Sequence, residues 1–465
     1  MGKIVVCGAG IVGLSVAIML AQDGHQVTVV EADPDGAPAA PVEAWELWKR
    51  KGVAQFHQPH NLFARFRQVC DEEMPGLTGQ LLAAGCVWVD YLDTLLPTLS
   101  DQSPRPGDDT LRFVTGRRPV VESVVAAAAA HQPGVSIRRG VRVAGLLAGR
   151  PAIPGTPHVA GVCTAAGEQL MADLVVDAMG RRTPVTGWLT QLGARRPHVE
   201  SEDCGFVYYS RYFTGTSRPR QRGPALAPIG SFSVLTLDSD NDTWSVTLFG
   251  PTGDAQLKAL REPDCFTRVV QACPMHAHWL DGTAITGVLA MAGILDRYRR
   301  FVLDGQPVVT GFAAVGDAWA CTNPSAGRGL SVGLIHAQLL RKLVRAHLDD
   351  PAMLARVWDE HTEQFVAPFY RNQIAADRAR IAEMDALWHG VEPPERNSVM
   401  GRLLAAAGSD PDVLRAVLET VQCLALPQEV LERPGIKDKV ARQAPGAPMR
   451  MPGPDRDQLL RLLSA

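Results

Sequence analysis

The first thirty residues show two kinds of apolar pattern. Residues 3–7 form a short apolar run typical of a strand buried on both faces, and residues 14–21 repeat their apolar positions at helical spacing. A second apolar run, residues 26–30, ends at Glu31. The pattern predicts a strand–helix–strand unit, which opens a doubly wound α/β fold.

Three glycines occupy the predicted turn between the first strand and the helix. Gly8 allows a tight turn, Gly10 lets a pyrophosphate approach the backbone, and Gly13 lets the helix pack closely on the strand. The helix N-terminus adds partial positive charge for the phosphates. Glu31, 18 residues past Gly13, is placed to accept hydrogen bonds from the ribose hydroxyls of an adenine nucleotide.

A second strand–turn–helix pattern follows much later in the chain. Residues 308–315 are apolar, and residues 330–346 have helical spacing. In the turn between them, Asp317 can bind a polyol such as a ribityl chain, and the N–H groups of residues 327–330 point out of the positive helix end. That helix end would stabilise an anionic reduced flavin ring. With the Asp-Ala-Met-Gly-Arg segment at 177–181, the pattern predicts an FAD site built from distant parts of the chain.

The region between these units is rich in β-type patterns. Residues 205–213 and 244–249 have the partly alternating character of strands, and the polar turn at 238–242 precedes the second of them. Beyond residue 347 the chain reads as helices. A sheet platform that interrupts a nucleotide fold suits a bound organic substrate.

Composition indicates an ordinary globular protein. The chain has 465 residues, 46% hydrophobic content and a net charge of −3, so we expect no nucleic-acid partner and no anionic membrane surface. No apolar run of 18 residues occurs, and the N-terminal apolar stretch belongs to the nucleotide fold, so we expect no membrane span and a cytoplasmic location.

The nine cysteines show no paired spacing and are expected to be reduced. Cys265, Cys273, His276 and His278 lie within 14 residues, but their spacing matches no common zinc pattern. We therefore predict no metal.

Taken together, these motifs resemble those of FAD-dependent monooxygenases of the para-hydroxybenzoate hydroxylase type, the class A flavoprotein monooxygenases, and most nearly the branch of the polyether epoxidases. The resemblance covers about three quarters of the chain. Besides the glycine turns it is carried by the Arg-Lys-Gly-Val-Ala-Gln segment at 50–55 followed by His60, by Arg118, by residues 177–181, and by 316–318 with 323–329.

The resemblance implies an α/β fold: an FAD-binding, Rossmann-like domain of the glutathione reductase type, an interrupting β-sheet substrate domain and a helical C-terminal region. The expected limits are residues 1–185 and 301–346 for the FAD-binding domain, with a substrate-side excursion over 71–107, residues 186–300 for the sheet domain, and 347–465 for the helical region.

The resemblance also implies a set of cofactor-binding residues spread over all the motifs. These are Gly8, Gly10, Ile11, Val12, Gly13, Glu31, Ala32, Arg50, Gln55, Arg118, Val143, Asp177, Gly180, Gly316, Asp317, Pro324, Gly327, Arg328 and Gly329. NADPH or NADH would supply the electrons. Many relatives have Asp-Gly where this chain has Asp177-Ala178, which leaves open whether the nicotinamide binds here or a separate flavin reductase delivers the electrons.

The implied reaction is insertion of one oxygen atom into an apolar small molecule through a flavin C4a-hydroperoxide, with molecular oxygen as co-substrate. Hydroxylation and epoxidation share this electrophile, so the residues do not choose between them. His60, Tyr208, Arg211 and Trp319 are candidates for orienting the substrate, and no further catalytic side chain is required because the chemistry centres on the flavin.

Three other functions stay open. A flavin halogenase shares the fold but needs a Trp-x-Trp-x-Ile-Pro segment and a lysine beside a tunnel for hypohalous acid, and none of the nine tryptophans has that spacing. A reductase of the geranylgeranyl reductase type would also use FAD. A non-enzymatic flavoprotein scaffold is the third, although it would not need Asp317 and the helix end beside the ring.

Overall fold

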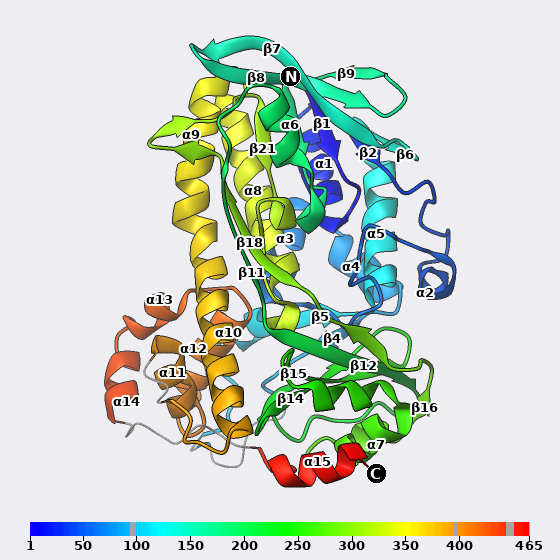
Figure 1. The fold of residues 1–465 in the computed structure, drawn as a ribbon, viewed down its shortest axis with the longest axis vertical. Helices are drawn as coiled ribbons and strands as arrows, with labels where there is room; N and C mark the ends of the chain where they lie inside the picture. The colour runs from blue at the N-terminus through cyan, green and yellow to red at the C-terminus, as the bar shows by residue number, and fades with distance from the viewer. Residues whose placement is uncertain (94–98, 100, 395–397, 443–450, 465) are drawn as a thin grey trace.

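A five-stranded parallel sheet forms one half of the protein (Figure 1). This computed structural model describes residues 1–93, 99, 101–394, 398–442 and 451–464. The strand order is β21 (Phe312–Ala314), β10 (Leu174–Asp177), β1 (Lys3–Cys7), β2 (Gln26–Glu31) and β6 (Val135–Arg139). Every neighbouring pair is parallel, as expected for a doubly wound nucleotide fold.

Both faces of this sheet are covered, which explains why its strands read as continuous apolar runs. Ile4 and Val6 pack into the core that holds three helices, α1 (Ile11–Gln22), α5 (Arg118–His131) and α8 (Gly329–His347). Val5 and Cys7 face the other way, into the core that also holds β7 (Val143–Ile153) and β8 (Thr156–Thr164). The short β9 (Gln169–Met171) completes that antiparallel layer.

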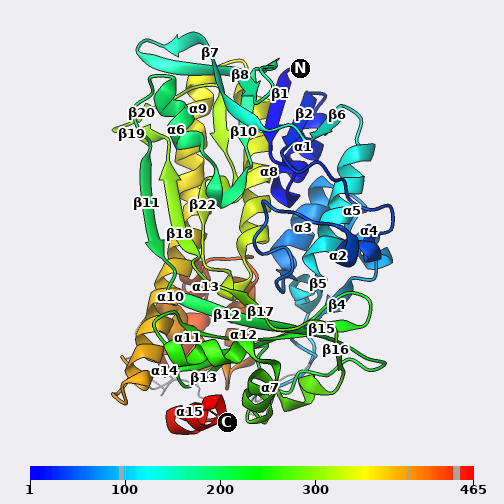
Figure 2. The same ribbon diagram turned by 45° about the vertical axis from the view of Figure 1, so that its right-hand side comes forward.

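A second, antiparallel sheet lies in the other half of the protein (Figure 2). Its order is β13 (Leu226–Ile229), β14 (Phe232–Asp238), β15 (Thr243–Pro251), β12 (Phe206–Thr214) and β16 (Thr283–Ala284), and β17 (Leu289–Met291) also pairs with β12. Alternation along β12 separates its tyrosines. Tyr209 belongs to the core shared with α7 (Pro263–Gln271) and α15 (Arg456–Ser464), whereas Tyr208 belongs to a cluster that includes Met384 of α10 (Ala367–Trp388).

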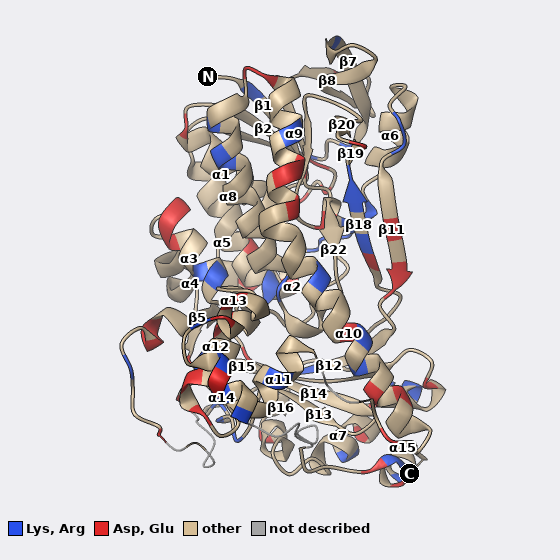
Figure 3. Cartoon of the chain, turned by 90° about the vertical axis from the view of Figure 1, so that its left-hand side faces the viewer, with Lys and Arg blue, Asp and Glu red and all other residues tan. Residues whose placement is uncertain are grey.

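Two long features connect the halves. A three-stranded sheet of β11 (His198–Asp203), β18 (Leu295–Arg300) and β22 (Ala320–Cys321) runs between them, and Figure 3 shows the basic residues of β18 beside the acidic end of β11. Helix α10 lies alongside and continues down to the second sheet (Figure 1). A π-helical turn, Thr362–Val366, joins α10 to α9 (Pro351–His361).

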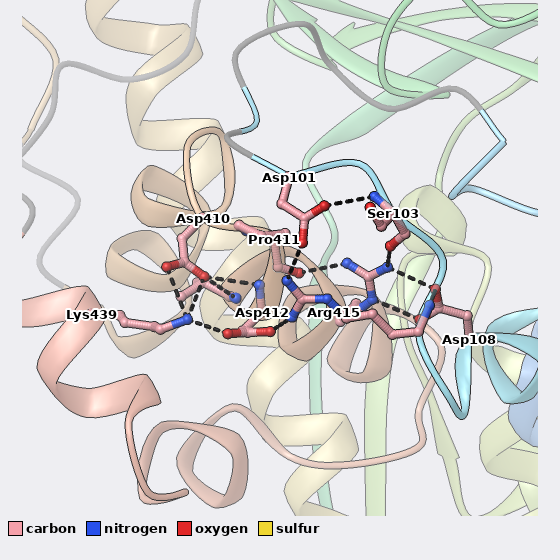
Figure 4. A network of polar contacts seen from close by, with 10 residues as sticks. Asp101, Ser103, Asp108, Asp410, Pro411, Asp412, Arg415 and Lys439 are labelled. Atoms are coloured by element: carbon pink, nitrogen blue, oxygen red, sulfur yellow. Dashed lines mark hydrogen bonds and ion pairs between the residues drawn. The ribbon is translucent and has the colours of Figure 1, made fainter.

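The C-terminal helices form a small cluster with a core of their own: α11 (Val399–Ala407), α12 (Pro411–Val421), α13 (Pro427–Leu431) and α14 (Ile436–Arg442). Polar contacts attach it to the segment before α5 (Figure 4). Arg415 donates to both carboxylate oxygens of Asp108, at 2.6 and 2.7 Å, and to the Ser103 carbonyl at 3.2 Å. Arg105 pairs with Asp412 from the other side.

The predicted fold class is confirmed: a Rossmann-like parallel sheet, a second sheet and a helical C-terminal region are all present. The predicted strand over 308–315 is wrong in its first half. Gly311 has a φ of +70°, and before it the Thr310 N–H bonds the Pro157 carbonyl, so only β21 joins the parallel sheet. The predicted excursion contains α4 (Leu77–Ala83) and β4 (Val87–Val89), and its residues 94–98 and 100 lie outside the described residues.

Within the described ranges, no helix combines the length and apolar character needed to cross a bilayer.

Candidate flavin site

The carboxyl ends of four parallel strands meet at one edge of the sheet. The register pairs Cys7 with both Asp177 and Val30, and pairs Asp177 with Ala314. The turn after each strand therefore lies beside the next, which brings the three sequence motifs together. Ligands of open α/β sheets bind at this edge.

The first glycine turn has the shape that a pyrophosphate needs. Gly8 has a φ of +106°, and a Cβ there would stand 2.5 Å from the Ala178 carbonyl oxygen. A Cβ on Gly13 would stand 2.2 Å from the Gly8 carbonyl oxygen, so helix and turn are in direct contact. The nearest atom to a Cβ on Gly10 is 3.8 Å away, and the N-terminus of α1 has no side-chain cap. Its backbone N–H groups remain for a phosphate.

Glu31 lies at the end of β2 as predicted, in a charged cluster that is mostly buried. Its Oε2 accepts from the Ala9 N–H and from Arg50 Nη2, both at 2.8 Å. Arg50 also pairs with Asp33 at 3.1 Å and lies 3.4 Å from Glu122. A carboxylate that is preoriented by an arginine and a backbone amide still has lone pairs for ribose hydroxyls.

Glu122 of α5 was not predicted as a site residue. Its side chain is fully buried, and both carboxylate oxygens lack a hydrogen bond although Arg50 and Arg118 lie within 4 Å. Its Oε1 is also the atom nearest to a Cβ added at Gly10, at 3.8 Å. Buried charged groups are normally satisfied, so this carboxylate holds two arginines beside the glycine turn through charge without hydrogen bonds of its own. The sequence signal was the helical spacing of Arg118 and Glu122, four residues apart on α5.

Arg118 and His60, two residues that carry the resemblance, lie together in the structure. Arg118 Nη1 donates to His60 Nε2 at 3.2 Å, and His60 Nδ1 donates to the Gln58 carbonyl at 2.8 Å. The carbonyl only accepts, so the proton sits on Nδ1. Burial and the Arg118 charge lower the pKa of His60 to about 3. His60 is therefore a neutral group that orients Arg118.

The third motif closes the site from the opposite side. Burial raises the pKa of Asp317, against the charges of Arg118 and Arg181. The Gly316 N–H donates to Nδ1 of the buried His336 at 3.3 Å, which holds the turn that carries Asp317. Gly327 has a φ of +67°, and α8 begins at Gly329 without a side-chain cap. Two bare helix ends, Asp317 and the arginines therefore fit the pyrophosphate, ribityl chain and ring of FAD.

Asp177 has a structural role in this arrangement. Its oxygens accept from Thr183 Oγ1 at 2.6 Å and from the Met179 N–H at 2.9 Å, and burial raises its pKa to about 6. These bonds fix the turn that packs against Gly8. The other implied cofactor residues lie around the same edge with varied exposure: Gln55, Gly180 and Arg328 are half-buried, Ala32 and Pro324 are exposed, and Val143 is buried at the start of β7.

The four substrate candidates do not gather in one place. Tyr208 donates its hydroxyl proton to Asn323 Oδ1 of the loop before α8. Arg211 leaves β12 on the other face and donates to the Thr286 carbonyl at 3.2 Å and to Thr267 Oγ1 at 3.3 Å. Trp319 packs edge-on against His336, with ring centroids 4.8 Å apart. Of the four, His60 and Tyr208 adjoin the FAD motifs through side-chain contacts, and Trp319 does so through its backbone N–H, which donates to the Gly316 carbonyl at 2.9 Å.

Sequence reasoning also missed Asp377, which accepts three hydrogen bonds near Asn323. It lies in a helix with no motif, so only the packing of α10 against the loop shows it. In the described part of the chain, no three His, Cys, Asp or Glu side chains are grouped for a metal ion.

Comparison with known proteins points to the same cofactor. A family model described as FAD dependent oxidoreductase matches residues 3–95. Protein Rv3254 of Mycobacterium tuberculosis (strain ATCC 25618 / H37Rv) is 30% identical over 374 residues, which cover 74% of this chain and 73% of Rv3254.

Solved structures share the fold at low identity. PqsL of Pseudomonas aeruginosa, a probable FAD-dependent monooxygenase, has a TM-score of 0.57 at 15% identity, over 83% of this chain and 99% of PqsL. A triple mutant of the flavin-dependent brominase Bmp2 has a TM-score of 0.57 at 15% identity, over 95% of this chain and all of Bmp2.

The fold and this edge of the sheet, together with the family model, define a flavoprotein, an FAD-dependent oxidoreductase. The chain belongs to the family of Rv3254.

Glu31→Gln tests the adenosine half of the site. The change removes the charge that holds Arg50 and would hold the ribose hydroxyls, so FAD affinity should fall by about 1.5–3 kcal/mol, the value of a hydrogen bond to a charged group. Fluorescence titration of the FAD-free protein measures the loss. Glu168→Gln, at an exposed ion pair with Arg138, is the matched control and should bind FAD normally. Equal loss in both variants would contradict the assignment of Glu31.

Proposed function

We propose that the protein is a flavin-dependent monooxygenase that inserts one oxygen atom into an apolar small molecule. The observation that carries the proposal is the Tyr208–Asn323 hydrogen bond, because it joins the second sheet directly to the loop expected to hold the flavin ring. The sheet domain, taken as residues 186–300, would then present the substrate to the ring. PqsL, the probable monooxygenase of the same fold, supports the proposal.

Bound FAD, once reduced, activates oxygen for transfer of a single atom. The chain's own residues would bind the cofactor, orient the substrate and exclude water. Glu31, Arg50 and Arg118 would hold the adenosine and phosphates, Asp317 the ribityl chain, and the start of α8 the negative charge of the reduced ring.

The face of β12 and β15 around Tyr208 is largely aromatic. Tyr208 stacks on Phe249, with ring centroids 5.1 Å apart, and Phe206 packs edge-on against the same ring at 5.8 Å. These rings lie in a buried cluster with Ile294 and Met384. Such surroundings favour an apolar substrate and keep water from the reacting atoms. They do not distinguish a double bond from an aromatic ring, so hydroxylation and epoxidation are both compatible with the proposal.

NADPH or NADH would deliver the electrons, either to this chain or to a separate flavin reductase. The Asp177-Ala178 segment supports the second route, because Asp177 is committed to its own turn by Thr183 and Met179.

Halogenation is the alternative that the Bmp2 likeness favours. A halogenase needs a lysine inside the protein, beside the path of hypohalous acid. All seven lysines of this chain are described, and each is exposed or, in the case of Lys439, half-buried in surface ion pairs. The geometry therefore favours oxygen transfer.

Reaction under ¹⁸O₂ tests the proposal. We expect one labelled oxygen atom in the product when the FAD-loaded protein is reduced and supplied with a panel of polycyclic and polyene-like molecules. Mass spectrometry of the products reads the label, and NADPH and NADH with and without added reductase identify the electron route. Product that forms equally well without oxygen would indicate a reductase, and product that requires halide would indicate a halogenase.

A further inference from the structure

A buried polar cluster lies where the loop at residues 323–325, the second sheet and α10 meet. Its centre is Asn323, which is 2% exposed. The Asn323 backbone N–H donates to Asp296 Oδ1 at 2.7 Å, its Nδ2 donates to Asp377 Oδ1 at 3.1 Å, and its Oδ1 accepts the Tyr208 hydroxyl. Every polar group that Asn323 turns toward this cluster therefore has a partner, and the partners come from three separate elements.

Asp377 is the acceptor on which several of these bonds converge. It is 5% exposed, and it accepts from Ser325 Oγ at 3.0 Å and from Gln373 Nε2 at 3.0 Å besides Asn323. Its three donors are neutral. Arg328 reaches the cluster through Gln373, whose Oε1 accepts from Arg328 Nη1 at 3.3 Å. Both ends of the loop, Asn323 and Arg328, are thus tied to one carboxylate on α10.

The chemistry of the bonds gives them a direction. A carboxylate only accepts, so the Asn323 amide must turn its NH₂ toward Asp377 and its oxygen toward Tyr208. Donation to a carboxylate polarises the amide and strengthens its oxygen as an acceptor. The position of the Tyr208 ring on the second sheet is therefore coupled, through Asn323, to a charge on α10.

We propose that Asp377 is a positioning residue that holds the loop at 323–328 against FAD and fixes Tyr208 relative to it. The inference rests on the proposed function only in treating the Tyr208 face as the substrate side. A helix that contacts both halves is suited to this task, because α10 carries Asp377 and Gln373 to the loop and Met384 to the Tyr208 cluster.

A double-mutant cycle tests the proposal with FAD alone. Asp377→Asn loses the charge and gives the amide of Asn323 no fixed direction, so FAD affinity should fall roughly tenfold, the low end for a hydrogen bond to a charged group. Tyr208→Phe should give a smaller loss. If Asp377 acts through Asn323 on Tyr208, the double variant should lose less than the product of the two single losses. The visible spectrum of bound FAD should shift in the Asp377 variant.

The matched control is Asp385→Asn, two turns further along α10 at an exposed carboxylate, which should bind FAD as the parent protein does. If Asp377→Asn does not fold, Asn323→Ala removes the residue that bonds both Asp377 and Tyr208, and it should reproduce the affinity loss and the spectral shift. Affinity within twofold of the parent, or losses that multiply without coupling, would overturn the proposal. A failed oxygen-transfer proposal would show in the ¹⁸O₂ experiment and would leave this cycle unaffected, because the cycle needs no substrate and no turnover.

Discussion

Replacing Asp317 with Ala should strip FAD from the purified protein while the fold remains. Asp317 is the one carboxylate at the turn before α8, and it would accept the hydroxyls of the ribityl chain. Two hydrogen bonds to a charged group are worth about 3–6 kcal/mol, so the affinity should fall by more than about 100-fold. Absorbance of flavin at 450 nm relative to protein, after dialysis, measures the loss.

The same variant should leave the stability of the FAD-free protein unchanged or raise it. Burial raises the pKa of Asp317 in the folded protein above its ordinary value. A carboxyl whose pKa is higher in the folded protein than in the unfolded chain destabilises the folded protein once it ionises. This free-energy cost begins as the pH rises above the unfolded pKa and is fully present above the folded pKa. The cost disappears in the Ala variant. Urea unfolding at neutral pH checks this, and a large loss of stability would show that Asp317 supports the fold instead of the cofactor.

Replacing Arg117 with Met should destabilise the protein by about 3–5 kcal/mol, because the buried carboxylate of Asp240 loses the arginine that neutralises its charge. Arg117 Nη2 and Nε donate to Asp240 at 2.7 and 3.1 Å, and the two side chains are 6% and 0% exposed. Asp240 lies in the turn between β14 and β15, and Arg117 immediately precedes α5. The pair therefore fastens the second sheet to the nucleotide fold beside Arg118.

Thermal and urea unfolding of the Arg117 variant measure this effect. Arg117→Met combined with Asp240→Asn should recover part of the loss. In the parent protein the backbone N–H of Arg117 donates to Asp240 Oδ1 at 2.6 Å, and in the double variant the backbone N–H at position 117 can still donate to the amide oxygen at position 240. Arg195→Met, at an exposed pair with Asp304, is the control and should unfold like the parent protein. Equal effects of the two arginine variants would contradict a special role for the buried pair.

The nucleotide half was predictable from the sequence because its determinants are local. The tight turn at Gly8, the close helix at Gly13 and the acid at the end of a strand depend on residue type and short spacing, and the structure places Gly8, Glu31, Asp177 and Asp317 at the ends of neighbouring parallel strands. Parallel strands buried on both faces read as apolar runs, so the pattern of residues 3–7 and 26–30 identified them correctly.

The contacts between the halves were not predictable in this way. Arg211 and Tyr208 are three residues apart on one strand, yet alternation and the packing of α7 send Arg211 to the Thr267 side while Tyr208 reaches Asn323. Nothing local marks Asp377 or Asp240, because each acquires its role from a partner more than fifty residues away.

The sequence by itself therefore determined the class of cofactor and the part of the fold that binds it, since glycine conformation, helix ends and strand ends are properties of short segments. Only the tertiary structure decided which side chains meet around that site, such as Glu122 with Arg50, His336 with Gly316, and Asp377 with Asn323. Those pairings depend on how helices and sheets pack across long stretches of chain. Burial in the protein interior then strengthens their polar bonds, because the local dielectric is low.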